Sequence, residues 1–183
     1  MPPTLPEVLI SEDRIRVRIA ELAGQISRDY GDRDRGGGGD EIVMVGVLKG
    51  AFIFLADLAR AMTIPRRVDF MGLSSYGRGG AQQSGVRLVM DLRESIEGQH
   101  VLVVEDIVDT GHTLHYLLDT LFARHPASLK TCALVQKRSR TVADVSIDYL
   151  GFEIPDRWVV GFGLDYKDRF RTLPYIGTIT PEE

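Results

Sequence analysis

The sequence predicts an α/β fold in which a central, mostly parallel sheet is flanked by helices. Short apolar, β-branched runs alternate with amphipathic segments, and turn residues separate the two kinds of segment along the whole chain. The chain has 183 residues, of which 44% are hydrophobic and 26% charged, and this suits one globular domain. We therefore expect residues 1–183 to form a single domain around one main sheet.

The individual elements follow from periodicity and turn residues. Residues 11–30 predict an amphipathic helix, with Ser11 as its cap and two acidic residues in its first turn. Further helices are predicted at residues 51–62 and 112–125, where apolar residues recur at helical spacing. Strands are predicted at residues 41–48, 66–76, 86–92, 101–105, 130–136, 148–154 and 158–164.

Two glycine-rich segments lie between these elements. Residues 31–40 (GDRDRGGGGD) contain Gly36–Gly39 in succession, and their spacing fits no phosphate-binding motif, so we expect a mobile surface loop. Residues 74–85 (SSYGRGGAQQSG) join two predicted strands. A long flexible loop between paired strands is typical of a lid over a binding site.

Composition and charge disfavour several classes of protein. No apolar run approaches the length of a membrane span, and the first residues lack the basic start and apolar core of a signal peptide. The net charge of −4 argues against broad attraction to nucleic acid or to an anionic membrane. Cys132 is the single cysteine, which excludes an internal disulfide, and its apolar neighbours predict a small buried side chain. We therefore expect a cytoplasmic protein with no nucleic-acid or membrane partner.

The segment VLVVEDIVDTGHT, residues 101–113, carries the clearest functional pattern. Ligands of parallel sheets bind at the carboxyl ends of the strands, where this segment places its polar residues. The N-terminus of the following helix would attract phosphate, Gly111 would let the backbone approach closely, and Thr110 and Thr113 would add hydroxyl donors. The pattern therefore predicts a cradle for a phosphomonoester.

Three acidic residues precede this cradle: Glu105, Asp106 and Asp109. They would repel a phosphate if they faced it, so we expect them to face sugar hydroxyls, a hard cation such as Mg²⁺, or a proton in transfer. A capped helix with solvated acids is the alternative. Two adjacent acids directly after a buried strand favour a site.

The motif EDIVDTGHT resembles the phosphoribosyl-diphosphate-binding motif of the type I phosphoribosyltransferases, and it is most similar to their hypoxanthine-guanine (6-oxopurine) branch. The segments LKG at 48–50, SSYG at 74–77 and GFEIPDRWVVGFGLDY at 151–166 also fit that branch, in the expected order. The likeness covers roughly residues 40–177. It implies the type I phosphoribosyltransferase fold, with a flexible active-site loop and a small hood built from the N-terminal segment and roughly residues 150–183.

The resemblance implies how the donor, phosphoribosyl diphosphate, is bound. Glu105 and Asp106 match the acids that hold the ribose hydroxyls, with Mg²⁺ close by, and residues 109–113 match the loop that holds the 5′-phosphate. Asp109 matches the acid proposed to exchange a proton with purine N7, a role that fits general acid–base catalysis. His112 departs from the family, which often has Asn, Lys or Arg there. Its backbone N–H suits the phosphate, and the role of its imidazole is left open.

The resemblance also implies contacts for the leaving pyrophosphate. Lys49 and Gly50 match the loop that contacts it, often after an unusual cis peptide bond. Arg171 matches a second pyrophosphate-binding position, and Asp165 matches a carboxylate that binds a second Mg²⁺. The alternatives are a surface turn lysine, an ordinary surface arginine and a turn acid.

For the purine, the resemblance points to three residues. Lys137 matches the lysine that donates a hydrogen bond to the 6-oxo group, which an ammonium can do because it only donates. Trp158 stands where the family often has a stacking Phe, and Val159 would offer backbone groups to the purine edge. We expect the neighbouring Arg138 and Arg140 to be solvated or to face a phosphate.

The mobile loop of the family closes over the site and would protect an oxocarbenium-like transition state from water. Its residues match Ser74, Ser75, Tyr76 and Gly77.

The implied function is magnesium-dependent purine salvage, in which N9 of hypoxanthine or guanine is joined to C1′ of phosphoribosyl diphosphate. A xanthine-preferring relative is one alternative. An RNA-binding regulator on the same fold is another, although the acidic net charge disfavours it. Relatives form dimers and tetramers, so we expect a homo-oligomer, with the apolar helix 51–62 as either interface or core.

Overall fold

The computed structural model describes residues 5–31, 41–76 and 85–181, so Gly36–Gly39 and Gly77 lie outside the described residues. The main sheet has six strands in the order β4-β3-β2-β5-β6-β7. Its strands are β2 (Ile42–Leu48), β3 (Arg66–Tyr76), β4 (Gly85–Met90), β5 (His100–Val108), β6 (Ser128–Gln136) and β7 (Tyr149–Glu153).

All neighbouring strands of the main sheet are parallel except β3 and β4, which are antiparallel. The predicted α/β class with a mostly parallel central sheet is therefore confirmed. Val108 at the end of β5 is the register partner of Gln136 at the end of β6. Because these two strands end side by side, the residues that follow them, Asp109 and Lys137, emerge at the same edge of the sheet.

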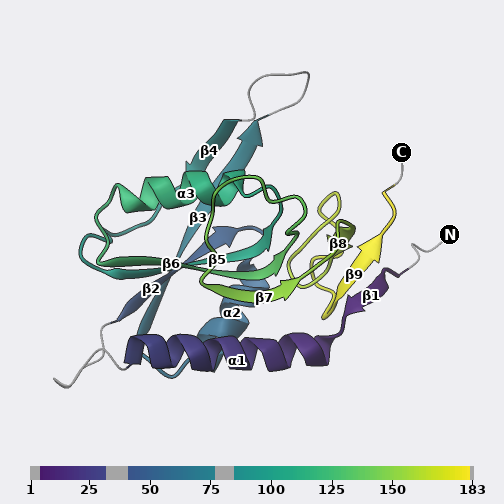
Figure 1. Cartoon of the computed structure of the whole chain (residues 1–183), viewed down its shortest axis with the longest axis horizontal. Helices are drawn as coiled ribbons and strands as arrows, with labels where there is room; N and C mark the ends of the chain where they lie inside the picture. The colour runs from purple at the N-terminus through teal and green to yellow at the C-terminus, as the bar shows by residue number, and fades with distance from the viewer. Residues whose placement is uncertain (1–4, 32–40, 77–84, 182–183) are drawn as a thin grey trace.

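Helices cover both faces of the main sheet (Figure 1). α1 (Glu12–Gly31) and α2 (Phe52–Ala61) pack on one face, and α3 (His112–Phe122) packs on the other. The alternation of strand side chains separates the two cores, since Met44 and Leu102 belong to the α1 side while Val43 and Val103 belong to the α3 side. Cys132 is buried and free, as predicted.

The helix predictions hold with small changes at the ends. Ser11 caps α1, because its Oγ accepts a hydrogen bond from the Arg14 backbone N–H at 3.4 Å. α2 turns Phe54, Leu55 and Leu58 into the core and leaves Phe52 partly exposed. Within the described part of the chain, no helix is long and apolar enough to cross a membrane.

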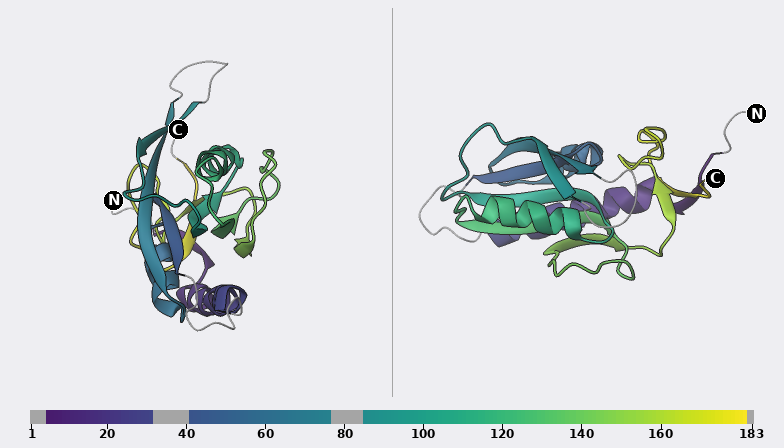
Figure 2. Two further views of the ribbon diagram at one scale, coloured as in Figure 1. Left: turned by 90° about the vertical axis from the view of Figure 1, so that its left-hand side faces the viewer. Right: turned by 90° about the horizontal axis from the view of Figure 1, so that it is seen from above.

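A second sheet of three antiparallel strands lies at one end of the molecule (Figure 2). It consists of β1 (Glu7–Ile10), β9 (Ile176–Ile179) and β8 (Trp158–Val160), in that order. The sequence predicted neither β1 nor β9, because each has only four residues. The strand predicted at 158–164 ends at Val160 because Gly161, Phe162 and Gly163 have positive φ, which turns the chain.

Candidate active site

A cavity of about 260 Å³ opens at the carboxyl ends of β2 and β5. Its wall contains the carboxylate-bearing residues Glu105, Asp106 and Asp109 and the loop residues Thr110, Gly111 and Thr113. Gly50, from the turn after β2, and Leu73, near the end of β3, complete the opposite side. The structure thus brings the predicted acids and the predicted phosphate cradle into one concave site.

The cradle begins with Gly111, whose φ of 86° places it in the left-handed region directly before α3. No side chain caps α3, so its first-turn N–H groups remain available to an anion. The Thr110 carbonyl accepts hydrogen bonds from the backbone N–H groups of Val142 and Ala143, both at 3.1 Å, which fixes the loop from behind. The side chain of His112 is exposed and does not line the cavity.

Glu105 and Asp106 form a pair of adjacent acids, of which Glu105 is buried and Asp106 is half-buried. Glu105 is only 6% exposed, and this burial raises its pKa well above the usual value, with a further increase from the neighbouring Asp106 charge. Burial raises the pKa of Asp106 to about 6, although backbone N–H groups and the charge of Arg171 oppose that increase. The pair therefore favours bound protons or a bound cation. Among the described residues, no three His, Cys, Asp or Glu side chains converge as a ready metal site.

The turn after β2 lies directly beside these acids. The Leu48–Lys49 peptide bond is cis. Gly50 packs so closely on the Asp106 carboxylate that a Cβ there would overlap it, and the Gly50 carbonyl packs in the same way on Gly163. A larger residue at position 50 would displace the Asp106 carboxylate, so the structure provides a steric reason for this part of the motif.

The two predicted pyrophosphate cations share one acid that the sequence analysis missed. Lys49 Nζ lies 3.3 Å from Asp168 Oδ1, and Arg171 donates to the same oxygen at 3.0 Å. Arg171 also pairs with Asp165 at 2.7 Å and donates to the Gly163 carbonyl at 2.8 Å. Arg171 and, less strongly, Lys49 hold the pKa of Asp168 below its usual range. Asp168 has φ of 59°, and no pattern in KDRFR indicated that it would turn back toward Lys49.

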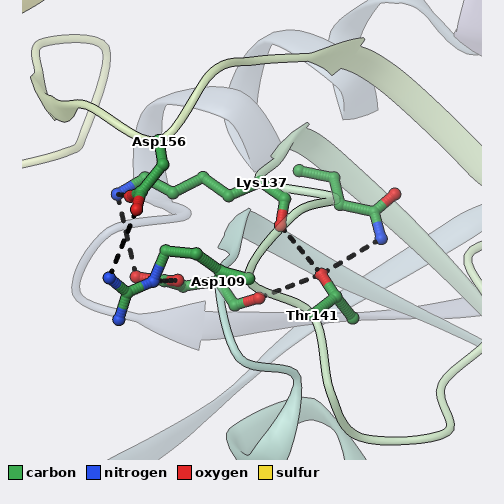
Figure 3. Close-up of polar contacts among 6 residues, drawn as sticks. Asp109, Lys137, Thr141 and Asp156 are labelled. Atoms are coloured by element: carbon green, nitrogen blue, oxygen red, sulfur yellow. Dashed lines mark hydrogen bonds and ion pairs between the residues drawn. The ribbon is translucent and has the colours of Figure 1, made fainter.

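The residues after β6 form a charged cluster around Asp109 (Figure 3). Lys137 is buried, and its Nζ lies 3.8 Å from Asp109 Oδ2 and 3.5 Å from Asp156 Oδ1. Arg140 Nε donates to Asp109 Oδ1 at 2.6 Å, and its Nη1 lies 3.6 Å from Asp156 Oδ2. Arg140 is exposed, as expected, but it also pairs with two acids, which the sequence analysis did not anticipate. The turn closed by the Arg140 N–H on the Lys137 carbonyl brings its guanidinium back to Asp109.

Thr141 connects the two strand ends behind this cluster (Figure 3). Its Oγ1 lies 2.9 Å from the Asp109 carbonyl and 3.1 Å from the Lys137 carbonyl, and it accepts a hydrogen bond from Gln136 Nε2. No sequence pattern indicated this contact, since a threonine in a polar turn is common. Arg138, by contrast, points away and pairs with Glu153 at 3.7 Å.

Trp158 and Val159, both predicted to contact a purine, do not line the cavity that contains Asp109. Val159 is buried, whereas Trp158 is 56% exposed and packs edge-to-face on Tyr166 with ring centroids 6.0 Å apart. Trp158 lines a different hollow of about 880 Å³, together with Arg157, Tyr166 and other residues. The structure therefore does not bring Trp158 into the wall that contains Asp109.

The predicted lid begins at the end of β3. Ser74, Ser75 and Tyr76 are register partners of Arg87, Val86 and Gly85 in β4. Leu73, the residue before them, lines the Asp109 cavity. The base of the predicted lid is therefore at the cavity.

Comparison with known proteins agrees with this geometry. Residues 11–167 match the family described as the phosphoribosyl transferase domain. The chain is 47% identical to hypoxanthine phosphoribosyltransferase from Haemophilus influenzae, over 97% of both chains. It is 46% identical to hypoxanthine-guanine phosphoribosyltransferase from Mycobacterium avium, over 98% of this chain and 88% of that one.

Solved structures show the same architecture. A hypoxanthine phosphoribosyltransferase from Trypanosoma cruzi aligns with a TM-score of 0.90 at 43% identity, covering 99% of this chain and 95% of that one. A hypoxanthine-guanine phosphoribosyltransferase from Bacillus anthracis aligns with a TM-score of 0.86 at 41% identity, covering 95% and 98%. The chain therefore belongs to the phosphoribosyltransferase family, in the branch that contains the hypoxanthine and hypoxanthine-guanine phosphoribosyltransferases.

Proposed function

We propose that the protein transfers the 5-phosphoribosyl group of phosphoribosyl diphosphate to N9 of hypoxanthine and of guanine. The products are IMP or GMP and pyrophosphate. The observation that carries this proposal is the position of Asp109, between the first turn of α3 and the buried ammonium of Lys137. A phosphate cradle, a carboxylate and a donor for a carbonyl group thus adjoin one another, as a ribosyl donor and a 6-oxopurine require.

In this proposal the donor occupies the Asp109 cavity. The first-turn N–H groups of α3 and the hydroxyls of Thr110 and Thr113 bind the 5′-phosphate. Glu105 and Asp106 accept hydrogen bonds from the ribose hydroxyls. In this arrangement their negative charge lies where positive charge develops at C1′ during the reaction.

Magnesium fits the chemistry of this acid pair. Mg²⁺ prefers oxygen ligands and commonly binds one or two carboxylates together with substrate phosphates. Glu105 and Asp106 would hold one ion with the donor, and Asp165 would hold a second near the diphosphate. When bound, the metal would supply positive charge to the leaving diphosphate. The raised pKa values of Glu105 and Asp106 are consistent with a site that gains from a cation.

Asp109 would act on the purine. As N9 attacks C1′ and the bond from C1′ to the diphosphate oxygen breaks, the proton at N7 moves to the Asp109 carboxylate. Lys137 would donate to O6, and its buried position makes an exocyclic amine at that place unfavourable because two donors would meet. Trp158 would stack on the base and Val159 would contact its edge through backbone groups.

Lys49, Gly50 and Arg171 would bind the pyrophosphate. Lys49 and Arg171 both pair with the Asp168 carboxylate. The more highly charged pyrophosphate would take the place of that carboxylate between them. Residues 74–77 would close over the site during turnover and exclude water.

The assay that tests the proposal mixes the protein with phosphoribosyl diphosphate, Mg²⁺ and either hypoxanthine, guanine, xanthine or adenine. Nucleotide should form with hypoxanthine and guanine, and chelation of Mg²⁺ should stop it. Replacement of Asp109 by Asn should lower kcat by about 100-fold or more, with little change in donor binding. Equal use of adenine, or near-wild-type turnover by Asp109→Asn, would contradict the proposed roles. A preference for xanthine would identify the alternative substrate.

Several broader properties belong to the same proposal. The small sheet would act as the hood of a single domain spanning residues 1–183, and the chain would assemble as a homo-oligomer, a dimer or a tetramer. We also place the enzyme in the cytoplasm, without a nucleic-acid or membrane partner. Light scattering coupled to gel filtration measures the assembly, and a monomeric mass at assay concentration would contradict it.

A further inference from the structure

We propose that Arg140 and Asp156 are positioning residues that keep Asp109 and Lys137 from closing to hydrogen-bond distance. They would thereby direct the two groups toward neighbouring atoms of the purine. This inference rests on the proposed function, since it assigns Asp109 and Lys137 to the purine.

Four charged side chains form a closed square in the loops that follow β5, β6 and β7 (Figure 3). Asp109 has Arg140 on Oδ1 at 2.6 Å and Lys137 near Oδ2 at 3.8 Å. Asp156 has Lys137 near Oδ1 at 3.5 Å and Arg140 near Oδ2 at 3.6 Å. Each acid therefore contacts both cations through different oxygens, and each cation contacts both acids.

The shortest contact in the square is the one that the proposed chemistry does not use. Arg140 Nε binds Asp109 Oδ1 at hydrogen-bond distance, while the separation of Lys137 from Asp109 Oδ2 is too long for a hydrogen bond. Arg140 thus fixes the plane and charge of the carboxylate and leaves Oδ2 free to accept a proton. The charge of Asp109 also raises the pKa of Arg140, which remains a cation at every working pH.

Asp156 has the complementary task. Lys137 is buried, and a buried ammonium needs a charged partner. If Asp109 were its only partner, the two would close to hydrogen-bond distance, and the purine would have to break that hydrogen bond before binding. Asp156 supplies the second partner and holds Nζ away from Asp109. The resulting gap of 3.8 Å suits the edge of a 6-oxopurine, which presents O6 and N7 side by side.

The loss of Arg140 and the loss of the Asp156 charge should have different effects on the reaction. Without Arg140, Asp109 loses its fixed orientation, so the proton transfer slows while the purine still finds Lys137. Without the Asp156 charge, Lys137 closes on Asp109, so purine binding weakens. Arg140 should therefore act mainly on kcat, and Asp156 mainly on the KM for the purine.

The experiment compares Arg140→Met, Arg140→Lys and Asp156→Asn with wild type, with Arg138→Met as the matched control. Arg138 is a neighbouring exposed arginine whose side chain pairs with Glu153, outside the square. Steady-state kinetics with hypoxanthine and phosphoribosyl diphosphate are measured for each variant, together with Tm.

We expect Arg140→Met to lower kcat by about 10- to 100-fold, with the hypoxanthine KM changed less than about 3-fold. Arg140→Lys should recover most of that loss, because an ammonium restores the charge. Asp156→Asn should raise the hypoxanthine KM by about 5- to 10-fold, with the KM for phosphoribosyl diphosphate unchanged. Arg138→Met should match wild type.

An Arg140→Met variant with the kinetics of Arg138→Met would overturn the role of Arg140. If Arg140→Met melts well below wild type, Asp156→Asn decides the question, and an unchanged hypoxanthine KM in that variant overturns the proposal. Inactive wild-type protein would instead contradict the proposed function, so the two failures are distinguishable.

Discussion

Gly50 and the Asp106 carboxylate lie in direct contact, so that a Cβ at position 50 would overlap Asp106 Oδ2. This contact joins the turn after β2 to the acid pair at the end of β5. The two segments are more than 50 residues apart in the sequence, yet they form adjoining parts of one cavity wall.

Gly50→Ala should displace Asp106 or the turn that carries Lys49. Since both groups are assigned to the donor, kcat/KM for phosphoribosyl diphosphate should fall by about 100-fold or more. Gly24→Ala is the control, because its Cβ would meet only the end of the Arg28 side chain, at 3.4 Å, on helix α1. That control should keep full activity and gain about 0.5–1 kcal/mol of stability. A fully active Gly50→Ala enzyme would refute the steric argument.

Glu105→Gln should stabilise the free protein in a pH-dependent way. A carboxyl whose folded pKa lies above its unfolded pKa binds protons on folding, so its contribution to stability falls as pH rises through that interval. For Asp106 the interval runs from 3.8 to about 6, and burial raises the pKa of Glu105 in the same direction. Removing one of the two charges should therefore raise Tm by a few degrees at pH 7.5, equivalent to about 1 kcal/mol, and much less at pH 4.5.

Thermal melts of Glu105→Gln and wild type across this pH range make the measurement. Glu97→Gln is a suitable control, since Glu97 is exposed and its side chain lies outside the cavity. A Tm difference that is equal at pH 4.5 and pH 7.5 would show that the buried charge is not its cause.

Asp168→Asn should strengthen pyrophosphate binding. Asp168 occupies Lys49 and Arg171 together, and an incoming pyrophosphate must displace it. Removing its charge should lower the inhibition constant of pyrophosphate by about 2- to 5-fold, with little change in Tm because the Lys49 and Asp168 side chains are about two-thirds exposed. Product-inhibition kinetics test this, with Asp119→Asn on α3 as the control. Weaker inhibition by pyrophosphate would mean that Asp168 supports the cations instead of competing for them.

Trp158 offers a direct optical test of purine stacking because it is the only tryptophan in the chain. If it stacks on the base, adding GMP to the protein should change its fluorescence, and Trp158→Phe should keep most activity while Trp158→Ala raises the purine KM by about 10-fold. Trp158 is half exposed and lies outside the Asp109 cavity wall, so stacking would require it to meet a base that extends from that cavity. Unchanged fluorescence at saturating GMP would remove Trp158 from the site.

The sequence predicted the main sheet and the motif that ends its central strand because local signals determine both. The apolar, β-branched run at residues 42–48 indicates a strand that is buried on both faces. The glycine before α3 can be identified from its neighbours in the sequence alone. The order of acids, Thr and Gly in the last residues of β5 and directly after it was enough to place the candidate site.

The contacts that the sequence did not reveal depend on long-range geometry. Arg140 reaches Asp109 only because Val108 and Gln136 are register partners, so the segments that follow them meet. Asp168 reaches Lys49 only through a turn with positive φ. Such contacts join residues 31 and 119 positions apart, and no local pattern encodes those distances.

The small sheet has a consequence for how the chain could be rearranged. Glu7 of β1 is the register partner of Thr178 of β9, so the first and last strands lie side by side. A short linker could join them into a ring, and new ends could be opened at Gly98, where an added Cβ would meet nothing within 4 Å. Circular permutation of this kind is tolerated where ends are close and the cut lies in an exposed turn. The active site should be kept, because it depends on how the strand ends are arranged in space and not on their order along the chain.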